Sequence, residues 1–206
     1  MENRNMDHVR IILASGSPRR TELLQTAGIV HEVVVSGADE DVQEENPARL
    51  VEMLSARKAE EVYERMAQQE PSGDLVVIGA DTVVAADGKI LGKPEDEEDA
   101  RRMLRMLSGR SHHVYTGVTL CGRIGSVRRE VSFSEESTVH VAQLTEKEIS
   151  EYIDSGEPMD KAGAYGIQGA FMKFVSGIEG DYFNIVGLPV SHLYQEMKQF
   201  ISKERC

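Results

Sequence analysis

The sequence contains no tryptophan, only two cysteines and no apolar run long enough to cross a membrane. The two cysteines, Cys121 and Cys206, are far apart and do not have the spacing of a metal site. This excludes a disulfide framework and favours a reducing compartment, with the cytosol or the nucleus as the default. Residues 1–10 are polar and lack the apolar core of a secretory signal peptide. We therefore expect a cytoplasmic protein with no membrane partner.

Basic residues are fewer than acidic ones. The chain has 23 Lys and Arg and 35 Asp and Glu, which gives a formal net charge of −12. Such a chain lacks the broad basic face on which nucleic-acid polymers displace counterions, so we expect no nucleic-acid polymer as a partner. A small polyanion is compatible, since a few cations and a divalent metal can hold it in a confined pocket. The hydrophobic content of 40% is enough for one large domain or for two lobes around a cleft.

Hydrophobic patterning predicts that helices and strands alternate early in the chain and that strands cluster in the middle. The predicted strands cover 9–13, 30–35, 75–86, 89–91, 113–120 and 131–141, and a hairpin precedes the last helix. The predicted helices cover 18–27, a long segment after 46–47, a segment from about 96 to 109, 145–156 and the C-terminal segment. No repeat or low-complexity linker interrupts this order. We expect residues 1–206 to form a single domain of the mixed α/β class, with an elongated sheet flanked by helices and two lobes around a central cleft.

The most informative segment is Ala14–Arg20, with the sequence ASGSPRR, which follows the first predicted strand. Ser17 suits the N-cap of the next helix, where its hydroxyl can bond a free backbone N–H, and Pro18 suits the first helical position. Arg19 and Arg20 then oppose the positive end of the helix dipole, at about 0.3–1 kcal/mol each, so replacing either should cost little stability. An anion bound at this helix end, most simply a phosphate chain, explains the arrangement. The alternative is an ordinary solvated helix face.

Two charged residues stand out further along the chain. Asp81 lies in an otherwise nearly uncharged run, so its carboxylate must meet a cation, a metal or a cleft. Lys93 precedes a proline and is therefore held extended, and the turn signal Asp87-Gly88 could return it toward Asp81. A turn-forming aspartate and a solvated loop lysine are the alternatives. Taken alone, Lys58 and Glu40 would be ordinary surface charges.

A glycine-spaced segment at 160–169 has the sequence DKAGAYGIQG. Its glycines permit close approach of the backbone to a ligand. Within it, Gln168 offers both a donor and an acceptor, and Tyr165 offers a ring face. A simple connecting loop is the alternative explanation.

Together these motifs resemble the Maf family of nucleoside triphosphate pyrophosphatases, which is related in fold to the inosine triphosphate pyrophosphatases. The resemblance covers roughly residues 9–200, with its motifs in the order that the family shows. They are residues 14–20, Lys58, Gly79–Thr82, Gly92–Pro94, Ser108-Gly109, Tyr115–Gly117, 160–169 and Gly187–Pro189. The chain departs from many relatives after Gly169, where it has Ala170–Lys173 instead of a glycine pair. This difference affects the expected shape of the pocket rim and not the expected chemistry.

The resemblance implies hydrolysis of a nucleoside triphosphate to the monophosphate and pyrophosphate, with a divalent metal, Mg²⁺ or Mn²⁺. It implies that Asp81 is the metal-linked catalytic acid or base and that Glu40 helps to carry the metal. Lys58 and Lys93 would neutralise the triphosphate. The implied substrate-binding residues are Ser15, Ser17, Arg19, Arg20, Thr82 and Gln168.

The base and the assembly state also follow from the resemblance. Subgroups with a glutamine at the position of Gln168 prefer dTTP and UTP, and a sister group with glutamate there prefers 7-methyl-GTP. The family likeness further implies a homodimer. Two other interpretations stay open: a nucleotide-binding regulator without turnover, and one domain of a larger fusion protein.

Overall fold

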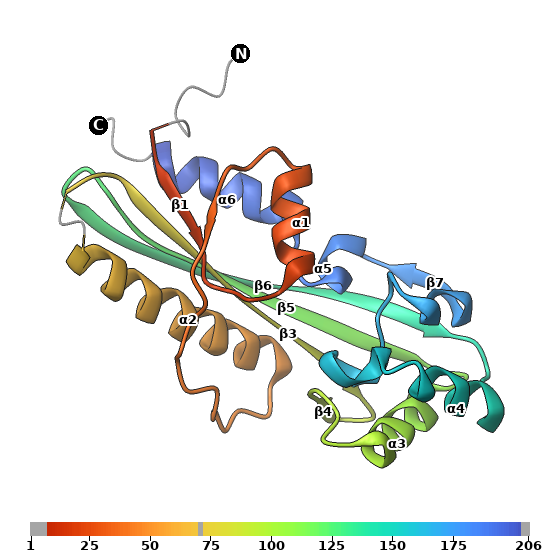
Figure 1. Cartoon of the computed structure of the whole chain (residues 1–206). Coiled ribbons are helices and arrows are strands. Elements are labelled where there is room, and N and C mark those ends of the chain that lie inside the picture. Colours follow the sequence, from red (N-terminus) through yellow and green to blue (C-terminus); the bar gives the residue numbers. More distant parts are fainter. Residues whose placement is uncertain (1–7, 70–71, 203–206) are drawn as a thin grey trace.

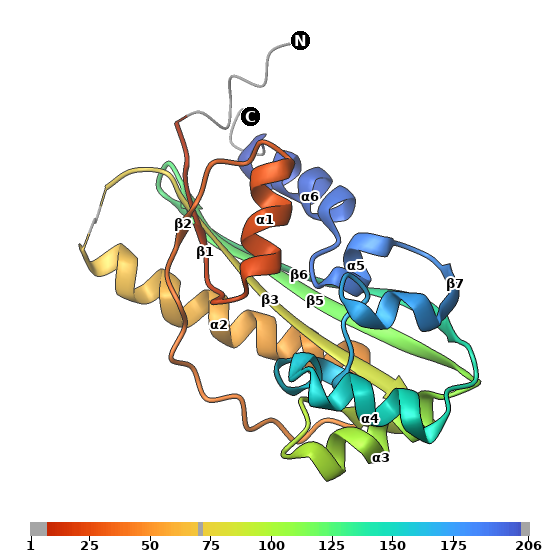
Figure 2. The same cartoon turned by 45° about the vertical axis from the view of Figure 1, so that its right-hand side comes forward.

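The computed structural model describes residues 8–69 and 72–202, and it shows one mixed sheet with helices on both faces (Figures 1 and 2). The strands are β1 (Arg10–Leu13), β2 (Glu32–Val33), β3 (Leu75–Ala86), β4 (Lys89–Leu91), β5 (Ser111–Ile124), β6 (Val127–Val141) and β7 (Val175–Glu179). The α-helices are α1 (Pro18–Thr26), α2 (Pro47–Gln69), α3 (Glu97–Leu107), α4 (Glu146–Asp154), α5 (Tyr182–Val186) and α6 (Val190–Ser202). Three short 3₁₀ helices are η1 (Glu157–Asp160), η2 (Ala162–Ala164) and η3 (Ala170–Phe174).

In the part of the chain that the structure describes, the sheet has seven strands in the order β2-β1-β3-β5-β6-β7, with β4 paired to β3. Strands β2, β1 and β3 run parallel, whereas β3, β5, β6 and β7 are antiparallel neighbours. Helix α2 covers one face, α1 and α6 lie on the other, and α3 and α4 lie at the far end of the sheet (Figures 1 and 2). The predicted mixed α/β class with an elongated sheet is confirmed. No helix within residues 8–69 and 72–202 is long and apolar enough to cross a membrane.

Local sequence signals place most elements correctly. Asp96 caps α3 by accepting from the N–H of Asp99, and Thr145 forms a capping box with Glu148 at the start of α4. The Asp87-Gly88 turn joins β3 to β4 as expected. Capping and turn signals act over a few residues, which is why the sequence alone can identify them.

Three predictions of strand structure need correction. The predicted strand at 30–35 is reduced to Glu32–Val33. The strands predicted at 113–120 and 131–141 are longer than expected, since they pair up to Ile124 and Val127 and leave only Gly125-Ser126 as the turn. The predicted hairpin before the last helix is a single strand, β7, paired to β6. The residues before β7 coil instead into η3, which buries the rings of Phe171 and Phe174 in the core.

Two glycines allow α2 to lie close to the sheet. A Cβ added to Gly79 on β3 would collide with the carbonyl oxygen of Ser55, and one added to Gly117 on β5 would collide with the backbone of Val51. The Ser55 hydroxyl also lies 2.8 Å from that of Thr119 on β5. The backbone of α2 therefore packs directly against the backbones of β3 and β5 at these glycines. This close packing decides which side chains of α2 reach β3.

Candidate active site

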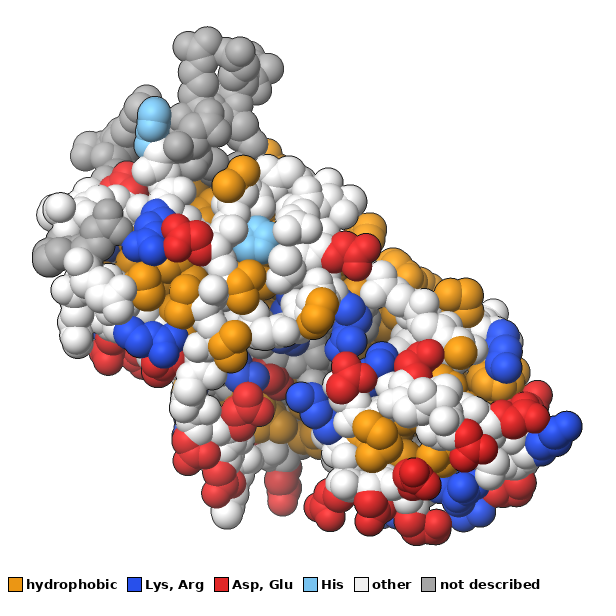
Figure 3. Space-filling view, viewed as in Figure 1, with side chains coloured by type: hydrophobic (Ala, Val, Ile, Leu, Met, Phe, Trp, Pro, Cys, Tyr) orange, Lys and Arg blue, Asp and Glu red, His pale blue; other side chains and the backbone are white. Residues whose placement is uncertain are grey.

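A cleft opens along the edge of β3 opposite β5, where part of that edge has no neighbouring strand. Strand β1 pairs with β3 only as far as Ile78, and β4 pairs with it only from Val84 onward, so neither covers residues 79–83 of that edge. The cleft has a volume of about 770 Å³ and is lined by the loop after β1, by α2, by β3 and by the segment 160–169. Figure 3 shows a hollow in the surface near the middle of the molecule, with basic and acidic side chains around it. An open strand edge explains how Asp81 and Thr82, which alternate in direction along β3, both line it.

The predicted strand-loop-helix unit is present in residues 14–20. Helix α1 begins at Pro18 with Ser17 as its N-cap, but the Ser17 hydroxyl makes no cap hydrogen bond, contrary to expectation. Instead, the backbone N–H of Ser17 donates to the Ser15 hydroxyl at 3.3 Å. The Ser17 hydroxyl is thus not engaged by α1, and Ser17 lines the cleft.

Arg20 is buried, with 9% of its surface exposed, and its guanidinium makes three hydrogen bonds to other described residues. It donates from Nε to the carbonyl oxygen of Gly187 at 2.7 Å, from Nη1 to the Ser15 hydroxyl at 2.9 Å and from Nη2 to the Thr82 hydroxyl at 3.0 Å. Burial lowers the pKa of Arg20 from its ordinary value. These contacts argue against the expectation that Arg20 can be removed at little cost, because this side chain joins three separate parts of the fold.

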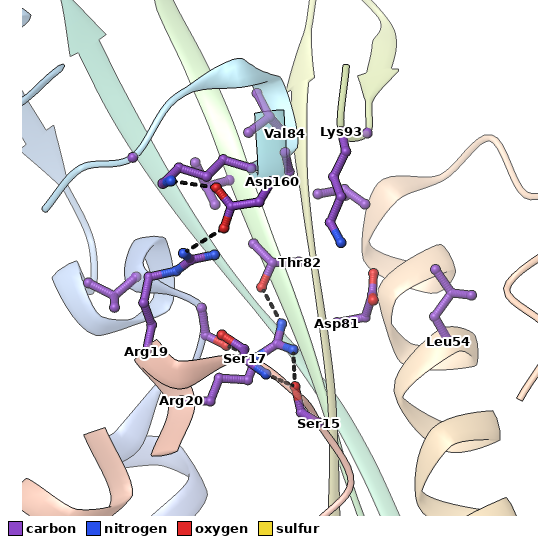
Figure 4. A pocket seen from close by; sticks show the side chains of 18 of the residues that line it. Ser15, Ser17, Arg19, Arg20, Leu54, Asp81, Thr82, Val84, Lys93 and Asp160 are labelled. Carbon is purple, nitrogen blue, oxygen red and sulfur yellow. Dashed lines mark hydrogen bonds and ion pairs between the residues drawn. The ribbon is translucent and has the colours of Figure 1, made fainter. Parts of the chain in front are cut away.

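Arg19 takes a different direction from its neighbour. It extends across the cleft, where its Nη1 lies 3.3 Å from a carboxylate oxygen of Asp160 (Figure 4). The other oxygen of Asp160 accepts from Lys161 Nζ at 2.6 Å. One carboxylate thus balances two cations at the mouth of the cleft, and both cations line it.

The carboxylate of Asp81 is paired, as its apolar surroundings demanded. Lys58 Nζ donates to Asp81 Oδ1 at 2.6 Å and lies 2.9 Å from Glu40 Oε1. The side chains of Lys58 and Asp81 are only 13% and 15% exposed. Because Gly79 faces α2 from the same side of β3 as Asp81, the missing side chain at 79 lets α2 bring Lys58 into contact.

Lys93 and Gln168 line the cleft and are exposed, and neither side chain makes a hydrogen bond within the described residues. Lys93 points into the cleft toward Asp81 and Thr82 (Figure 4). The Thr82 hydroxyl, by contrast, is already bonded to Arg20 and lies 2.9 Å from the hydroxyl of Thr116. The structure therefore brings together every predicted site residue, while Arg20 and Thr82 form part of the wall.

The sequence does not predict the residues that hold Thr82 in the wall of the cleft. The Thr116 hydroxyl donates to the carbonyl oxygen of Asn184, whose amide donates in turn to Ser137 at 2.9 Å. The sequence places Asp160 in the glycine-spaced segment at 160–169 but does not identify it as the partner of Arg19. No local pattern indicates such contacts, because each joins residues from distant parts of the chain.

A buried histidine of β5 contacts the glycine-spaced segment at 160–169 through Tyr165. His112 on β5 places Nε2 2.7 Å from the hydroxyl of Tyr165, and both residues are buried. Burial, with smaller contributions from His113 and His140, lowers the pKa of His112 to about 4. His112 is therefore neutral at physiological pH.

This shifted pKa predicts a loss of stability in mild acid. The unfolded chain, with an ordinary His pKa of about 6.5, binds the proton before the native state does, so stability falls as the pH drops from about 6.5 to about 4. Between about pH 7.5 and pH 5 the loss from this group is about 2 kcal/mol. Urea unfolding of the wild type and of His112→Gln at both pH values measures it. Equal pH dependence in the two proteins would contradict the prediction.

Comparison with known proteins identifies the family. A family model described as "Maf-like protein" matches residues 10–200. The chain belongs to the Maf family. It is 52% identical to a dTTP/UTP pyrophosphatase of Agathobacter rectalis, over 92% of this chain and 97% of that protein. It is also 50% identical to a protein of the same name from Lachnoclostridium phytofermentans (93% and 95% covered).

A solved structure is also similar in outline. The Staphylococcus aureus Ham1 protein covers 93% of this chain and 99% of its own, with a TM-score of 0.47 and 10% identity. The fold class itself rests on the order and direction of the strands in this Maf protein.

Proposed function

We propose that this Maf protein is a nucleoside triphosphate pyrophosphatase that hydrolyses dTTP and UTP, and C5-modified pyrimidine nucleotides, to the monophosphate and pyrophosphate. The observation that carries the proposal is the Lys58–Asp81 pair at the open edge of β3, facing a cleft lined by Arg19 and Lys93. A cleft of about 770 Å³ is within the range of small-molecule sites. The names of the similar Maf proteins support the same activity.

The charges of the cleft suit this reaction. Attack of water at the α-phosphorus, with pyrophosphate leaving, builds negative charge on the bridging and leaving oxygens. In the proposed complex Arg19 and Lys93 hold the phosphate chain from opposite sides, and Lys58 neutralises it beside Asp81. The hydroxyls of Ser15 and Ser17 lie in the same loop, while Arg20 and Thr82 form the wall against which the phosphates are placed. The Asp81 carboxylate orients the attacking water and accepts its proton.

The family resemblance implies a divalent metal, and the carboxylates present fit one. Asp81 and Glu40 both bring oxygen atoms to Lys58 Nζ, so two hard donors converge at one place. No cluster of three protein ligands occurs within the described residues, but Mg²⁺ is commonly held by one or two carboxylates together with substrate phosphates. Bound by Asp81 and Glu40, Mg²⁺ or Mn²⁺ would neutralise charge on the phosphates.

A screen of pyrophosphate release tests the function. The full chain is incubated with common and modified nucleoside triphosphates, with Mg²⁺, with Mn²⁺ and with chelator. We expect the highest kcat/KM for dTTP and UTP, and loss of turnover in chelator. Tight binding of nucleotides without release of pyrophosphate would favour instead the regulator without turnover.

Gln168 provides a prediction about the choice of base. The uracil or thymine edge presents acceptor, donor and acceptor, which an amide can match in part, whereas the two donors of guanine suit a carboxylate. Gln168→Glu should therefore lower kcat/KM for dTTP and UTP by about ten-fold or more, because a polar contact in a closed site is lost. The comparison of dTTP, UTP and 7-methyl-GTP in both proteins measures the effect. A wild-type preference for 7-methyl-GTP, or indifference to the substitution, would remove Gln168 as the specificity residue.

We further propose that residues 1–206 act as one domain, that two copies form a homodimer and that the protein works in the cytosol. The homodimer is supported by the family resemblance and is tested by light scattering of the purified protein. The free, buried thiol of Cys121, whose pKa burial raises to about 11, is consistent with a reducing compartment. Cys206 lies outside the described residues.

A further inference from the structure

A short turn carries Gln168 into the cleft. Residues 166–169, here called the Gln168 turn, close on themselves because the N–H of Gly169 donates to the carbonyl oxygen of Gly166 at 3.2 Å. The Gln168 side chain makes no hydrogen bond within the described residues. Its direction is therefore set by the backbone of the turn, and whatever holds that backbone also places the amide.

The side chains of Tyr152 and Glu157, which do not line the cleft, form hydrogen bonds to the backbone at the two ends of the Gln168 turn. The hydroxyl of Tyr152 on α4 accepts from the N–H of Gly166 at 3.2 Å and donates to Glu157 Oε1 at 2.9 Å. The second oxygen of Glu157, Oε2, accepts from the N–H of Ala170 at 2.9 Å. A single relay, from Tyr152 to Glu157, thus spans the turn from its first residue to the residue after its last. Neither member of the relay is among the residues that line the cleft.

The glycines of the turn make room for this relay. A Cβ added to Gly169 would collide with the carboxylate of Glu157. One added to Gly166 would come within 2.6 Å of the Lys161 side chain, whose ammonium donates to the Glu157 carbonyl oxygen at 2.7 Å. The absence of a side chain at Gly166 and Gly169 therefore allows Lys161 and Glu157 to pack against the turn, in addition to any close approach of the backbone to a ligand.

The tyrosine of the relay is buried, and Glu157 is partly exposed. Tyr152 is 4% exposed, and its ring lies 5.2 Å from that of Phe171, which is itself fully buried. Burial, together with the hydrogen bond to Glu157, raises the pKa of Tyr152, so its hydroxyl keeps the proton that it donates. Because both oxygens of Glu157 are used, by the Tyr152 hydroxyl and by the N–H of Ala170, the pair favours one backbone conformation of the turn.

We propose that Tyr152 and Glu157 are positioning residues that set the base selectivity of the cleft by holding the Gln168 turn. The inference rests on the proposed function, in which Gln168 contacts the base. The groups placed against the phosphates belong to the loop after β1, to α1, α2 and β3 and to the segment after β4, and none of these groups contacts Tyr152 or the Glu157 carboxylate in the described residues. Loosening the turn therefore raises KM for pyrimidine nucleotides and lowers the discrimination between bases, while kcat stays close to that of the wild type.

The main variant is Tyr152→Phe, which removes the hydroxyl and keeps the ring packed against Phe171. Glu157→Gln is the second variant, because it keeps the size of the side chain and removes one acceptor. We expect KM for dTTP and UTP to rise about five- to ten-fold in each, with kcat within about two-fold. The ratio of kcat/KM for UTP to that for 7-methyl-GTP should fall by a similar factor. The control is Tyr63→Phe, since Tyr63 is a buried tyrosine of α2, away from the cleft, whose hydroxyl makes no hydrogen bond in the described chain.

Inorganic tripolyphosphate separates a positioning role from a general loosening of the cleft, because it has phosphates and no base. Its inhibition constant should be the same in the wild type, Tyr152→Phe and Glu157→Gln. If Tyr152→Phe matches Tyr63→Phe in KM and selectivity, or weakens tripolyphosphate as much as UTP, the inference is overturned. A wild type that turns over neither dTTP nor UTP would overturn the proposed function instead. In that case the same comparison is made with the Kd for UTP, and a wild type that does not bind UTP overturns both.

Discussion

Asp81→Asn is expected to lower kcat for dTTP and UTP by about 10³-fold while leaving the protein folded. Removal of a positioned acid or base typically costs about 10²–10⁴-fold in rate. The substitution is nearly isosteric, and Lys58 keeps its contact with Glu40 at 2.9 Å, so no cation is left without a partner. Measurement of kcat by pyrophosphate release, with circular dichroism to establish folding, checks the prediction.

The matched control for this variant is Asp87→Asn. Asp87 is also paired with a cation, since its carboxylate lies 2.6 Å from Arg110, but it lies in the β3–β4 turn and does not line the cleft. Its backbone has a φ of +50°, which asparagine accommodates well. The control should keep its activity. A folded Asp81→Asn protein with near wild-type kcat would exclude the proposed mechanism.

Arg20→Ala is expected to destabilise the protein by about 3 kcal/mol, although its neighbour Arg19 can be replaced at little cost. Removal of Arg20 deprives three acceptors of a charged donor, among them the carbonyl oxygen of Gly187 at the end of α5. The favourable relief of the helix dipole is about 0.3–1 kcal/mol and does not offset this loss. Urea unfolding of both alanine variants measures the difference.

The kinetic behaviour of the two arginine variants should also differ. Arg19→Ala should raise KM for dTTP and UTP, because the Arg19 side chain, 33% exposed, is free to exchange Asp160 for a phosphate. Arg20→Lys should recover only part of the stability, since an ammonium cannot reach three acceptors in the plane of a guanidinium. Equal stability of Arg20→Ala and the wild type would show that the three hydrogen bonds contribute nothing measurable.

The sequence predicted those parts of the site whose signals are local. Pro18 marks the start of α1, and the Asp87-Gly88 turn returns the chain so that Lys93 enters the cleft. The uncharged run around Asp81 indicated that its carboxylate needed a partner, but not that Lys58 would provide it. That pairing joins residues 23 positions apart and depends on α2 packing closely over Gly79.

By itself, the sequence determined most of the element order, the caps at Asp96 and Thr145, the Asp87-Gly88 turn and the family, because each of these rests on short patterns or on motifs in a set order. The tertiary structure decided which of two adjacent arginines points inward. Neighbouring positions on a helix differ by about 100° in direction, and nothing within Ser17–Arg20 distinguishes them. Arg20 meets a carbonyl oxygen 167 residues away, whereas Arg19 meets a carboxylate across the cleft. Which arginine is buried depends on how α1 packs against β3 and α5. Arg20 is the one whose guanidinium meets the acceptors that this packing brings together.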